Sequence, residues 1–282
     1  MSYLTGLFGR GIGASKSGLI HERESRNLGL SLVYRLIDFD ALKLGDEALP
    51  DMLAAAVRLG YQGLNITYPF KQKIIPYLDD LSEEAQLLGA VNAVVIRDGR
   101  LTGHNTDWYG FAQSLRLALP SEPLGSVLQL GAGGAGSAVA YALLRSGVEC
   151  LYLSDPDVTK RDEIIRRFAD AFPDQRIVAC ETPQSVVPLV NGVVQASPIG
   201  MAHHPGVPMD TSGLNATQWV VDIIYFPAQT EFLKKAADKG CRTFNGEGMV
   251  VYQAAEGFRL FTGIVPDDAR MLREFSQPAP DR

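Results

Sequence analysis

The sequence predicts an α/β protein of two domains, the second of them built on a doubly wound, mainly parallel sheet. From residue 126 onward, short apolar runs typical of strands alternate regularly with helical patterns, as expected for parallel strands joined by crossover helices. The chain has 282 residues, enough for two domains with a core each. We expect the first α/β domain at 1–106 and the second at 107–246, with a C-terminal helix at 247–275 joining the first.

The first domain is expected to end in a hairpin that turns across Asp98 and Gly99. Gly60 is expected to close the helix before it, because glycine readily takes the left-handed conformation found at helix ends. The predicted strands are 3–9, 33–39, 63–67, 93–96 and 101–104, and the predicted helical stretches are 18–28, 52–59, 74–78 and 83–88.

The second domain is expected to begin with a helix from Asp107 to Leu119. Near its end, a helix at 248–262 is apolar on one side, so we expect it to return and pack on the first domain. The predicted strands between them are 127–130, 150–153, 176–180, 192–196, 219–223 and the edge strand 242–244, and the predicted helices are 137–146, 158–171, 184–190 and 232–239.

A glycine cluster follows the first strand of the second domain and precedes an alanine-rich helix. This is the form G-x-G-x-x-G in the context that dinucleotide-binding folds of the Rossmann type require. Gly131 can take the tight turn, Gly133 lets the backbone approach a pyrophosphate, and Gly136 lets the helix pack close to the sheet. The alternative is a glycine turn without a ligand. The expected cofactor-binding residues here are Gly131, Ala132, Gly133, Gly134, Ala135 and Gly136.

An acid ends the next predicted strand, about twenty residues further on, where such folds bind the adenosine ribose. This acid is Asp155, and Asp157 adds a second carboxylate. Carboxylates accept hydrogen bonds from ribose hydroxyls and repel the 2′-phosphate of NADP, so we expect NAD as the cofactor and NADP as the less favoured one. Lys160 and Arg161 lie close enough to weaken that exclusion. The alternative for both aspartates is a turn and a helix cap.

Composition argues against several classes of partner. Acidic residues exceed basic ones, 32 to 26, and no basic run is present, so we expect no nucleic-acid partner. No apolar stretch approaches the roughly 20 residues of a membrane span, and the first residues lack a signal-peptide pattern, so we expect a cytoplasmic protein without a membrane partner. The three cysteines are expected to be buried thiols. The histidines have no metal-ligand spacing with Cys, Asp or Glu, so no metal is expected.

Three polar stretches outside the glycine cluster, two in the first domain and one at the start of the second, could do chemistry. The segment 65–71 is a polar strand end with a proline at its exit and Lys71 just after it. Ser15 and Ser17 offer two hydroxyls which, if the backbone is extended, project to the same side and suit the two oxygens of a carboxylate. Asp107 stands at a helix N-terminus.

Each of these residues also has a purely structural alternative. Lys71 alone is typical of a solvated surface group, and Ser15 with Ser17 is typical of a helix-capping pair. Asp107 is typical of an N-cap, which is compatible with catalysis. Gln253 lies on a mostly apolar helix face, where a buried polar group needs a partner.

Together these motifs resemble the shikimate/quinate dehydrogenase family over nearly the whole chain. The resemblance implies an N-terminal substrate domain, a C-terminal Rossmann domain, and the oxidation of a cyclic hydroxy acid in the shikimate pathway of aromatic amino acid biosynthesis. The matching motifs are S-K-S at 15–17, N-I-T-x-P-F-K at 65–71, G-A-V-N at 89–92, N-T-D at 105–107, G-A-G-G-A-G at 131–136 and G-M-x-x-x-Q-A at 248–254.

The resemblance also implies roles for single residues. Lys71 matches the family's acid/base and Asp107 its partner, while Ser15 and Ser17 match the hydroxyls that hold the substrate carboxylate. The other expected site residues are Thr67, Asn92, Asp107 and Gln253 for the ring hydroxyls, Tyr225 as a further substrate-facing residue, and Gly246 for the cofactor.

The implied chemistry is consistent with these residue types. Oxidising a secondary alcohol sends a hydride to the nicotinamide while a base takes the hydroxyl proton. Lysine is a poor base at its ordinary pKa of about 10.4. Partial burial beside a positively charged nicotinamide lowers the pKa of a lysine, while a neighbouring carboxylate opposes that shift and fixes the amine.

Two departures from the family pattern bear on the choice of substrate and cofactor. Gly18 follows the second serine where many biosynthetic members carry proline, and the N-R-T-x-x-R pattern of NADP-using members is absent after residue 153. Both features resemble the NAD-using quinate/shikimate branch. Quinate-accepting members often have threonine at the position of Ser17, so shikimate is the expected substrate.

Three alternatives remain open at this point: quinate or aminoshikimate as the main substrate, and a non-catalytic module that senses NAD or shikimate. Retention of both Lys71 and Asp107 argues against the last. The expected assembly is a monomer or a homodimer.

Overall fold

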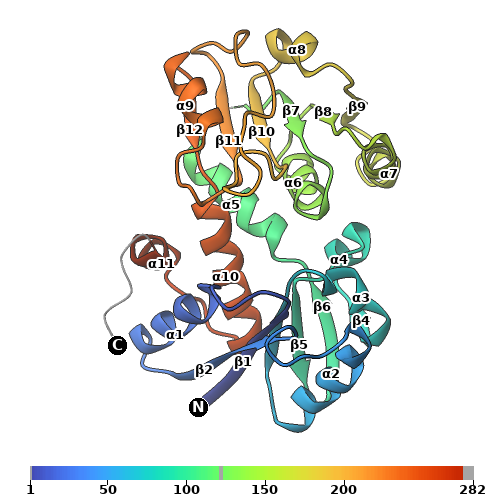
Figure 1. Ribbon diagram of the computed structural model, residues 1–282, viewed down its shortest axis with the longest axis vertical. Helices are drawn as coiled ribbons and strands as arrows, with labels where there is room; N and C mark the ends of the chain where they lie inside the picture. Colours follow the sequence, from blue (N-terminus) through green and yellow to red (C-terminus); the bar gives the residue numbers. More distant parts are fainter. Residues whose placement is uncertain (1, 121–122, 276–282) are drawn as a thin grey trace. The chain divides into compact units, whose positions relative to one another are not determined.

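The computed structural model describes residues 2–120 and 123–275 (Figure 1). They divide into two compact units: unit 1 holds residues 2–106 and 251–275, and unit 2 holds the described residues from 107 to 250. The division falls inside a long helix, which contributes its first turn to unit 2. No helix in the described ranges is long and apolar enough to cross a membrane.

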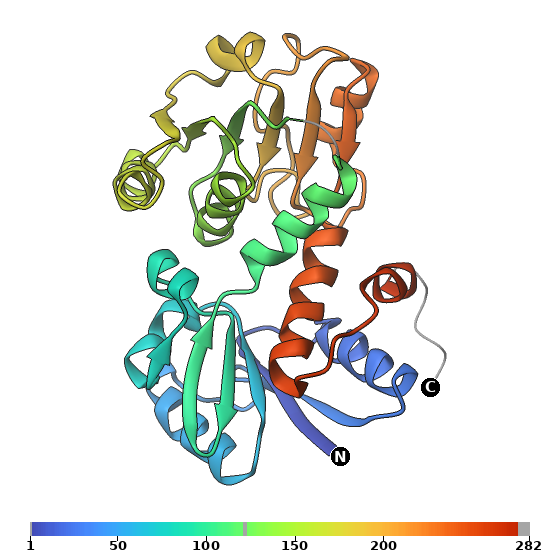
Figure 2. The ribbon, with the colours of Figure 1, turned by 180° about the vertical axis from the view of Figure 1, so that it is seen from behind.

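Unit 1 is built on a mixed sheet with the strand order β2-β1-β3-β5-β6-β4. Strand β1 is parallel to both of its neighbours, β2 and β3, whereas β5 runs antiparallel to β3 and to β6. The antiparallel pair is the predicted hairpin and can be followed in Figure 2. The strands are β1 (Ser2–Gly9), β2 (Ser31–Asp38), β3 (Gly63–Ile66), β4 (Asp80–Leu81), β5 (Ala93–Arg97) and β6 (Arg100–His104).

The helices of unit 1 come from both ends of the chain. α1 is tied to α11 by a partly buried ion pair, in which Arg270 donates to Glu24 Oε1 at 2.6 Å. The helices are α1 (Ser17–Asn27), α2 (Leu49–Arg58), α3 (Phe70–Lys73), α4 (Glu83–Leu88), α10 (Glu247–Thr262) and α11 (Asp268–Phe275), with 3₁₀ turns η1 (Asp46–Ala48) and η2 (Ile75–Tyr77).

The single C-terminal helix predicted at 247–275 is wrong, because α10 ends at Thr262 and α11 begins at Asp268. Gly263 takes a left-handed conformation with φ 75°, which a helix cannot continue. The side chain of Thr262 then accepts the backbone N–H of Ile264 at 3.1 Å. These two features turn the chain out of the helix.

Prolines also shorten two other predicted helices. The stretch predicted at 74–78 contains only the 3₁₀ turn η2, with Pro76 inside it, and the α-helix α3 ends before it at Lys73. The helix predicted at 184–190 is α8 (Pro183–Val186) followed by a 3₁₀ turn with Pro188. A proline inside a helix removes a backbone donor and clashes with the preceding turn.

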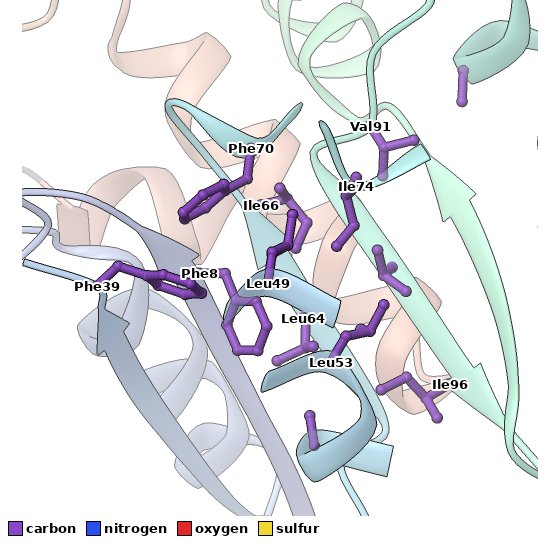
Figure 3. Packing of buried hydrophobic residues seen from close by; sticks show 13 residues of the cluster. Phe8, Phe39, Leu49, Leu53, Leu64, Ile66, Phe70, Ile74, Val91 and Ile96 are labelled. Atoms are coloured by element: carbon purple, nitrogen blue, oxygen red, sulfur yellow. The ribbon is translucent and has the colours of Figure 1, made fainter. Parts of the chain in front are cut away.

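The main core of unit 1 lies between α2 and the sheet, as Figure 3 shows. The ring centroid of Phe39 lies 4.4 Å from that of Phe70 and 5.8 Å from that of Phe8. Phe70 opens α3, so its burial fixes the start of the helix that carries Lys71. The other buried members are Leu49, Leu53, Ala56, Leu64, Ile66, Ile74, Ala85, Val91, Val94 and Ile96.

Unit 2 is built on a fully parallel sheet with the strand order β12-β11-β10-β7-β8-β9. Read from β7, the chain moves outward to β9, then crosses to β10 and moves outward on the other side. This is the doubly wound order, with its topological switch point between β7 and β10. The strands are β7 (Ser126–Leu130), β8 (Cys150–Ser154), β9 (Arg176–Ala179), β10 (Gly192–Gln195), β11 (Trp219–Asp222) and β12 (Arg242–Phe244).

The first crossover helix of unit 2 begins earlier than predicted. It starts at Gly134, inside the glycine cluster, and not at residue 137, with Gly133 as its N-cap. The last glycines of the motif therefore form the first helical turn, which brings their N–H groups to the helix N-terminus. The helices are α5 (Asp107–Ala118), α6 (Gly134–Arg145), α7 (Val158–Ala169), α8 and α9 (Glu231–Asp238).

Candidate active site

Ser15 and Ser17 lie at the start of α1 with their hydroxyl oxygens 3.1 Å apart. Lys16 between them has helical backbone angles, φ −85° and ψ −1°, so a turn brings the two hydroxyls together, and not the extended backbone that the sequence suggested. Ser15 Oγ also accepts the backbone N–H of Ser17 at 3.3 Å. The Lys16 ammonium lies 5.0 Å from the ring centroid of Phe275. The paired hydroxyls can serve the two oxygens of one carboxylate.

Thr67 lies directly after β3, at the carboxyl end of the parallel part of the sheet. Its N–H donates to the carbonyl of Phe8 at 3.0 Å, and its carbonyl accepts the N–H of Phe70 at 2.8 Å. Gly9, at the end of β1, makes room for it, because a Cβ at Gly9 would lie 2.5 Å from Thr67 Cγ2. Thr67 is half-buried.

Lys71 lies in the first turn of α3 and is half-buried. Its carbonyl accepts the N–H of Val91 at 2.8 Å, which ties α3 to the chain just before Asn92. Lys73, on the same short helix, is exposed and forms an ion pair with Asp46. Lys71 is therefore more buried than Lys73, and its backbone is fixed beside that of Asn92.

Asn92, Thr106 and Gln253 form one hydrogen-bonded group. Asn92 Oδ1 accepts the backbone N–H of Thr106 at 2.6 Å, and Asn92 Nδ2 donates to Thr106 Oγ1 at 3.1 Å. Thr106 Oγ1 in turn donates to Gln253 Oε1 at 3.3 Å. Asn92 and Thr106 are almost fully buried. The structure thus brings together residues from the start of β5, the end of β6 and α10.

Two buried residues that the sequence reasoning did not assign complete this network. The Tyr34 hydroxyl donates to Asn65 Oδ1 at 2.8 Å, and Asn65 Nδ2 donates to the carbonyl of Asn92 at 3.4 Å. Burial raises the pKa of Tyr34, and a hydrogen bond with Ser17 partly opposes that rise. Asn65 opens the N-I-T motif, so the sequence could have pointed to it. For Tyr34 the one local signal was its inward position in the alternating strand β2.

Asp107 is the first residue of α5 and directly follows Thr106 in the chain. It is half-buried. Its position is thereby linked to Thr106, whose N–H and hydroxyl are both hydrogen-bonded to Asn92.

The glycine turn of unit 2 lies at the switch point of the sheet. Gly131 has φ 105°, and a Cβ there would lie 2.7 Å from the carbonyl carbon of Ala196, at the end of β10. A Cβ at Gly136 would lie 2.4 Å from the carbonyl oxygen of Gly131. Gln129 clamps the turn, because its Nε2 donates to the carbonyls of Gly131 at 2.8 Å and Gly136 at 2.7 Å.

The exposed side of this turn fits a pyrophosphate. A Cβ at Gly133 or Gly134 would meet no other atom within 4 Å, so the backbone there is open to a ligand. Both residues stand at the N-terminus of α6, where free N–H groups and the helix dipole favour an anion. The residues present are therefore those that a dinucleotide needs.

Asp155 lies beside the glycine turn. Its Oδ2 accepts the backbone N–H of Ala132 at 2.6 Å, and its Oδ1 accepts the N–H of Asp157 at 2.8 Å. Asp157 caps α7 by accepting from Thr159 and Lys160. Asp155 therefore contacts the glycine turn, while Asp157 forms the predicted helix cap; the contact of Asp155 with a ribose stays a prediction.

Tyr225 and Gly246 occupy the loops that follow β11 and β12. Tyr225 is 45% exposed, and its loop is held by the buried Asp222, whose Oδ2 accepts from Thr230 Oγ1 at 2.7 Å. Burial raises the pKa of Asp222 to about 6. Gly246 donates its N–H to the carbonyl of Ile224 at 3.1 Å. Among the described residues, no cluster of His, Cys, Asp or Glu could hold a metal ion.

A doubly wound sheet with a glycine turn at its switch point, joined to a second α/β unit with a buried polar network, defines a two-domain dinucleotide-binding protein. Comparison with known proteins narrows this class. The family profile described as "Shikimate dehydrogenase substrate binding domain" matches residues 7–94, and "Shikimate 5'-dehydrogenase C-terminal domain" matches residues 246–274. The chain belongs to the shikimate/quinate dehydrogenase family of NAD(P)-dependent oxidoreductases.

Named relatives include users of either cofactor. The shikimate dehydrogenase (NADP(+)) of Arthrobacter sp. (strain FB24) is 48% identical over 97% of this chain and 94% of its own length. The quinate/shikimate dehydrogenase (NAD(+)) of Corynebacterium glutamicum (strain R) is 43% identical over 97% of this chain and 98% of its own length. Similarity alone therefore leaves the choice between NAD and NADP unresolved.

Solved structures support the same fold. Quinate dehydrogenase from Corynebacterium glutamicum in complex with NAD has a TM-score of 0.91 at 43% identity, covering 97% of this chain and 98% of that one. Shikimate 5-dehydrogenase from Listeria monocytogenes in complex with shikimate and NAD has a TM-score of 0.88 at 27% identity, covering 97% and 96%.

Proposed function

We propose that this protein is an NAD-dependent dehydrogenase that interconverts shikimate and 3-dehydroshikimate. The observation that carries the proposal is that unit 1 holds both the hydroxyl pair of Ser15 and Ser17 and the hydrogen-bonded group of Asn92, Thr106 and Gln253. Such a set of polar groups suits a ring that bears a carboxylate and several hydroxyls. The membership of the chain in the family supports the same substrate class.

In this proposal Ser15 and Ser17 bind the substrate carboxylate, and Thr67, Asn92 and Gln253 orient the ring hydroxyls. Lys71 takes the proton from the reacting hydroxyl during oxidation and returns it during reduction. Its place in a helix tied to the backbone before Asn92 supports this role.

Asp107 is proposed as the partner of Lys71 and as a further contact for the substrate. Tyr225 is proposed to face the substrate as well, from the loop held by Asp222. Both roles are inferred from motif positions and can be tested by mutating each residue.

The cofactor would be held by the backbone of residues 131–136, by Asp155, and by the backbone at Gly246. NAD, when bound, accepts the hydride that leaves the alcohol carbon. The preference for NAD over NADP is supported by the Asp155 carboxylate at the glycine turn. It is also supported by the two nearby basic residues, since Lys160 is paired with Asp157 and Arg161 with Asp162. Each of these cations is therefore already paired with a carboxylate, which reduces the positive charge that a 2′-phosphate would meet.

Quinate oxidation is the second candidate. One observation favours it: the relative at 43% identity over 97% of the chain is named for both quinate and shikimate. Quinate carries an additional hydroxyl on the carbon that bears the carboxylate, so discrimination between the acids would fall on Ser15 and Ser17. Quinate-accepting members of the family often have threonine at the position of Ser17, which keeps shikimate as our first choice and leaves aminoshikimate as a third acid to test.

The deciding experiment compares kcat/KM for shikimate, quinate and aminoshikimate, each with NAD and with NADP. The proposal expects the highest value for shikimate with NAD. A higher value for quinate would make that acid the main substrate, and a higher value with NADP would overturn the cofactor assignment. Tight binding of NAD or shikimate without turnover would favour a sensing module. We place the protein in the cytoplasm, a location that its three buried, free thiols fit.

A further inference from the structure

The loop between β1 and α1, which carries Ser15, is held by a carboxylate on the neighbouring strand. Asp38 ends β2, and its Oδ1 accepts the backbone N–H of Gly11 at 3.1 Å while its Oδ2 accepts that of Ile12 at 2.9 Å. Oδ1 also accepts the N–H of Asp40 at 3.0 Å. Both oxygens of the Asp38 carboxylate are therefore engaged by backbone donors, and two of these donors belong to the loop.

Ile12 connects this carboxylate to the serine pair. The carbonyl of Ile12 accepts the backbone N–H of Ser15 at 2.9 Å. Ser15 Oγ in turn donates to Ser17 Oγ at 3.1 Å and accepts the N–H of Ser17 at 3.3 Å. A continuous series of hydrogen bonds therefore runs from the Asp38 carboxylate to the two hydroxyls.

The side chain of Ile12 anchors the same loop in the core of unit 1. It is 7% exposed and packs in a buried cluster with Leu7 and Phe258. A Cβ at Gly9 would lie 2.7 Å from Ile12 Cγ2, so the glycine leaves the space that this side chain fills. The loop thus has an apolar anchor in addition to the Asp38 carboxylate.

The charge of Asp38 suits it to hold backbone N–H groups. Burial tends to raise the pKa of this carboxyl, but the hydrogen bonds from backbone N–H groups outweigh burial, so the pKa of Asp38 lies below its ordinary value. Hydrogen bonds to an ionised acceptor are stronger than those between neutral groups. An amide of the same shape is a poor substitute, because its NH₂ group would face a backbone N–H donor in place of an acceptor.

We propose that Asp38 is a positioning residue for the substrate carboxylate. It fixes the backbone of Gly11 and Ile12, and through Ile12 it sets the place of the Ser15 hydroxyl before the substrate arrives. Less freedom of the loop is then lost on binding. This inference rests on the proposed function, in which Ser15 and Ser17 bind a carboxylate.

An isosteric replacement in a double-mutant cycle tests the inference. Asp38→Asn is expected to raise KM for shikimate about 3- to 10-fold, the range for ordering one side chain on binding. The value of kcat and the KM for NAD are expected to change less than about twofold. On a Ser15→Ala background the same substitution is expected to change KM for shikimate less than about twofold, because the hydroxyl through which it acts is gone.

Asp40→Asn is the matched control. Asp40 is exposed, and its carboxylate pairs with Arg10 at 2.6 Å and not with the N–H groups of the loop. The substitution removes the same charge two positions away, so KM for shikimate is expected to change less than about twofold. An equal rise in KM for Asp40→Asn and Asp38→Asn would overturn the inference, because it would assign the effect to local charge alone.

Hydrogen exchange of the backbone amides at residues 11–17 gives a readout without turnover. In the wild type these amides are expected to exchange slowly with or without shikimate. In Asp38→Asn they are expected to exchange at least about threefold faster without ligand and to be slowed by shikimate. Equal exchange in the two free proteins would contradict the proposed preordering of the loop.

Other outcomes would also overturn the inference. They are an unchanged or lower KM in Asp38→Asn, and an equal rise in KM on the wild-type and Ser15→Ala backgrounds. A fall in kcat equal to the rise in KM, with a lower Tm, would mark a general structural role and would overturn it as well. If Asp38→Asn does not fold, Asp38→Ser, which keeps one acceptor oxygen, takes its place in the same cycle.

Failure of the inference can be distinguished from failure of the proposed function. If the wild type binds shikimate but oxidises none of the three acids, the proposed function fails and the cycle is read from dissociation constants measured by calorimetry. If the wild type does not bind shikimate, both fail. If the wild type oxidises shikimate and the cycle is additive, the inference alone fails.

Discussion

The carboxylate of Asp155 accepts a hydrogen bond from the backbone N–H of Ala132, with 2.6 Å between Oδ2 and the nitrogen. This bond places a negative charge at the second residue of the glycine turn. An adenosine ribose at this point would meet an acceptor, and a 2′-phosphate would meet a like charge.

Replacing Asp155 is expected to reduce the preference for NAD over NADP. Asp155→Ala should raise KM for NAD about 10-fold or more, because hydrogen bonds to a charged group are worth about 1.5–3 kcal/mol, while KM for NADP should fall or stay unchanged. Steady-state kinetics with both cofactors measures this. Asp174→Ala, an exposed aspartate in the same unit, is the control. An unchanged NAD/NADP ratio would leave the ribose contact unsupported.

Lys71 is expected to be required for the chemical step. Lys71→Ala should lower kcat about 10²- to 10⁴-fold, the usual contribution of a general acid or base. NAD binding, measured by fluorescence titration, should be unchanged. Lys73→Ala on the same helix should cost little activity, because Lys73 is exposed and paired with Asp46. Equal effects of the two substitutions would remove Lys71 from the mechanism.

Substitution of Gly136 should impair both folding and cofactor binding, whereas substitution of Gly133 should impair cofactor binding alone. Gly136→Ala would bring a Cβ to 2.4 Å from the carbonyl oxygen of Gly131, so we expect a lower Tm and weak NAD binding. Gly133→Ala meets open space, so we expect an unchanged Tm with a higher KM for NAD. Thermal melts and cofactor titrations of both variants check this. A normal KM for NAD in folded Gly133→Ala would contradict the expected approach of the pyrophosphate.

Acid should destabilise unit 1 through His21. Burial lowers the pKa of His21 from 6.5 to about 3, and both ring nitrogens lack a hydrogen-bond partner. Between about pH 6.5 and about pH 3, the unfolded chain therefore binds a proton at His21 that the folded chain does not bind. Stability is fully present above the unfolded pKa and is lost as the pH falls from about 6.5 toward 3.

The free energy of unfolding should thus fall by about 2 kcal/mol between about pH 7 and about pH 4.5 from this group alone. Urea unfolding of the wild type and of His21→Phe at both pH values measures it. The variant should show the shallower pH dependence. Equal slopes in the two proteins would mean that His21 takes up its proton in the folded state.

The parts of the fold that the sequence predicted are those specified over short distances. The strand, glycine cluster and helix at 126–145 could be read directly, because strand end, turn and helix start are adjacent in the chain. The hairpin of β5 and β6 was predictable for the same reason. Helix ends were harder: the glycines of the motif were assigned to a loop, although they form the first turn of α6.

Residues that act through distant partners could not be found in this way. Tyr34 is 31 positions from Asn65 and looks like an ordinary inward residue of an alternating strand. Asn65 lies within a quoted motif, but its contact with Asn92 depends on how β3 pairs with the start of β5. Gln129 reads as a polar interruption in an apolar strand until the glycine turn folds back onto it.

The clamp that Gln129 applies to the glycine turn has a kinetic consequence. Because one buried amide already joins the carbonyls of Gly131 and Gly136, the turn is shaped when the chain folds and does not have to be ordered when the nucleotide arrives. Association should therefore proceed in a single bimolecular phase, linear in nucleotide concentration, without a slower isomerisation of the turn behind it.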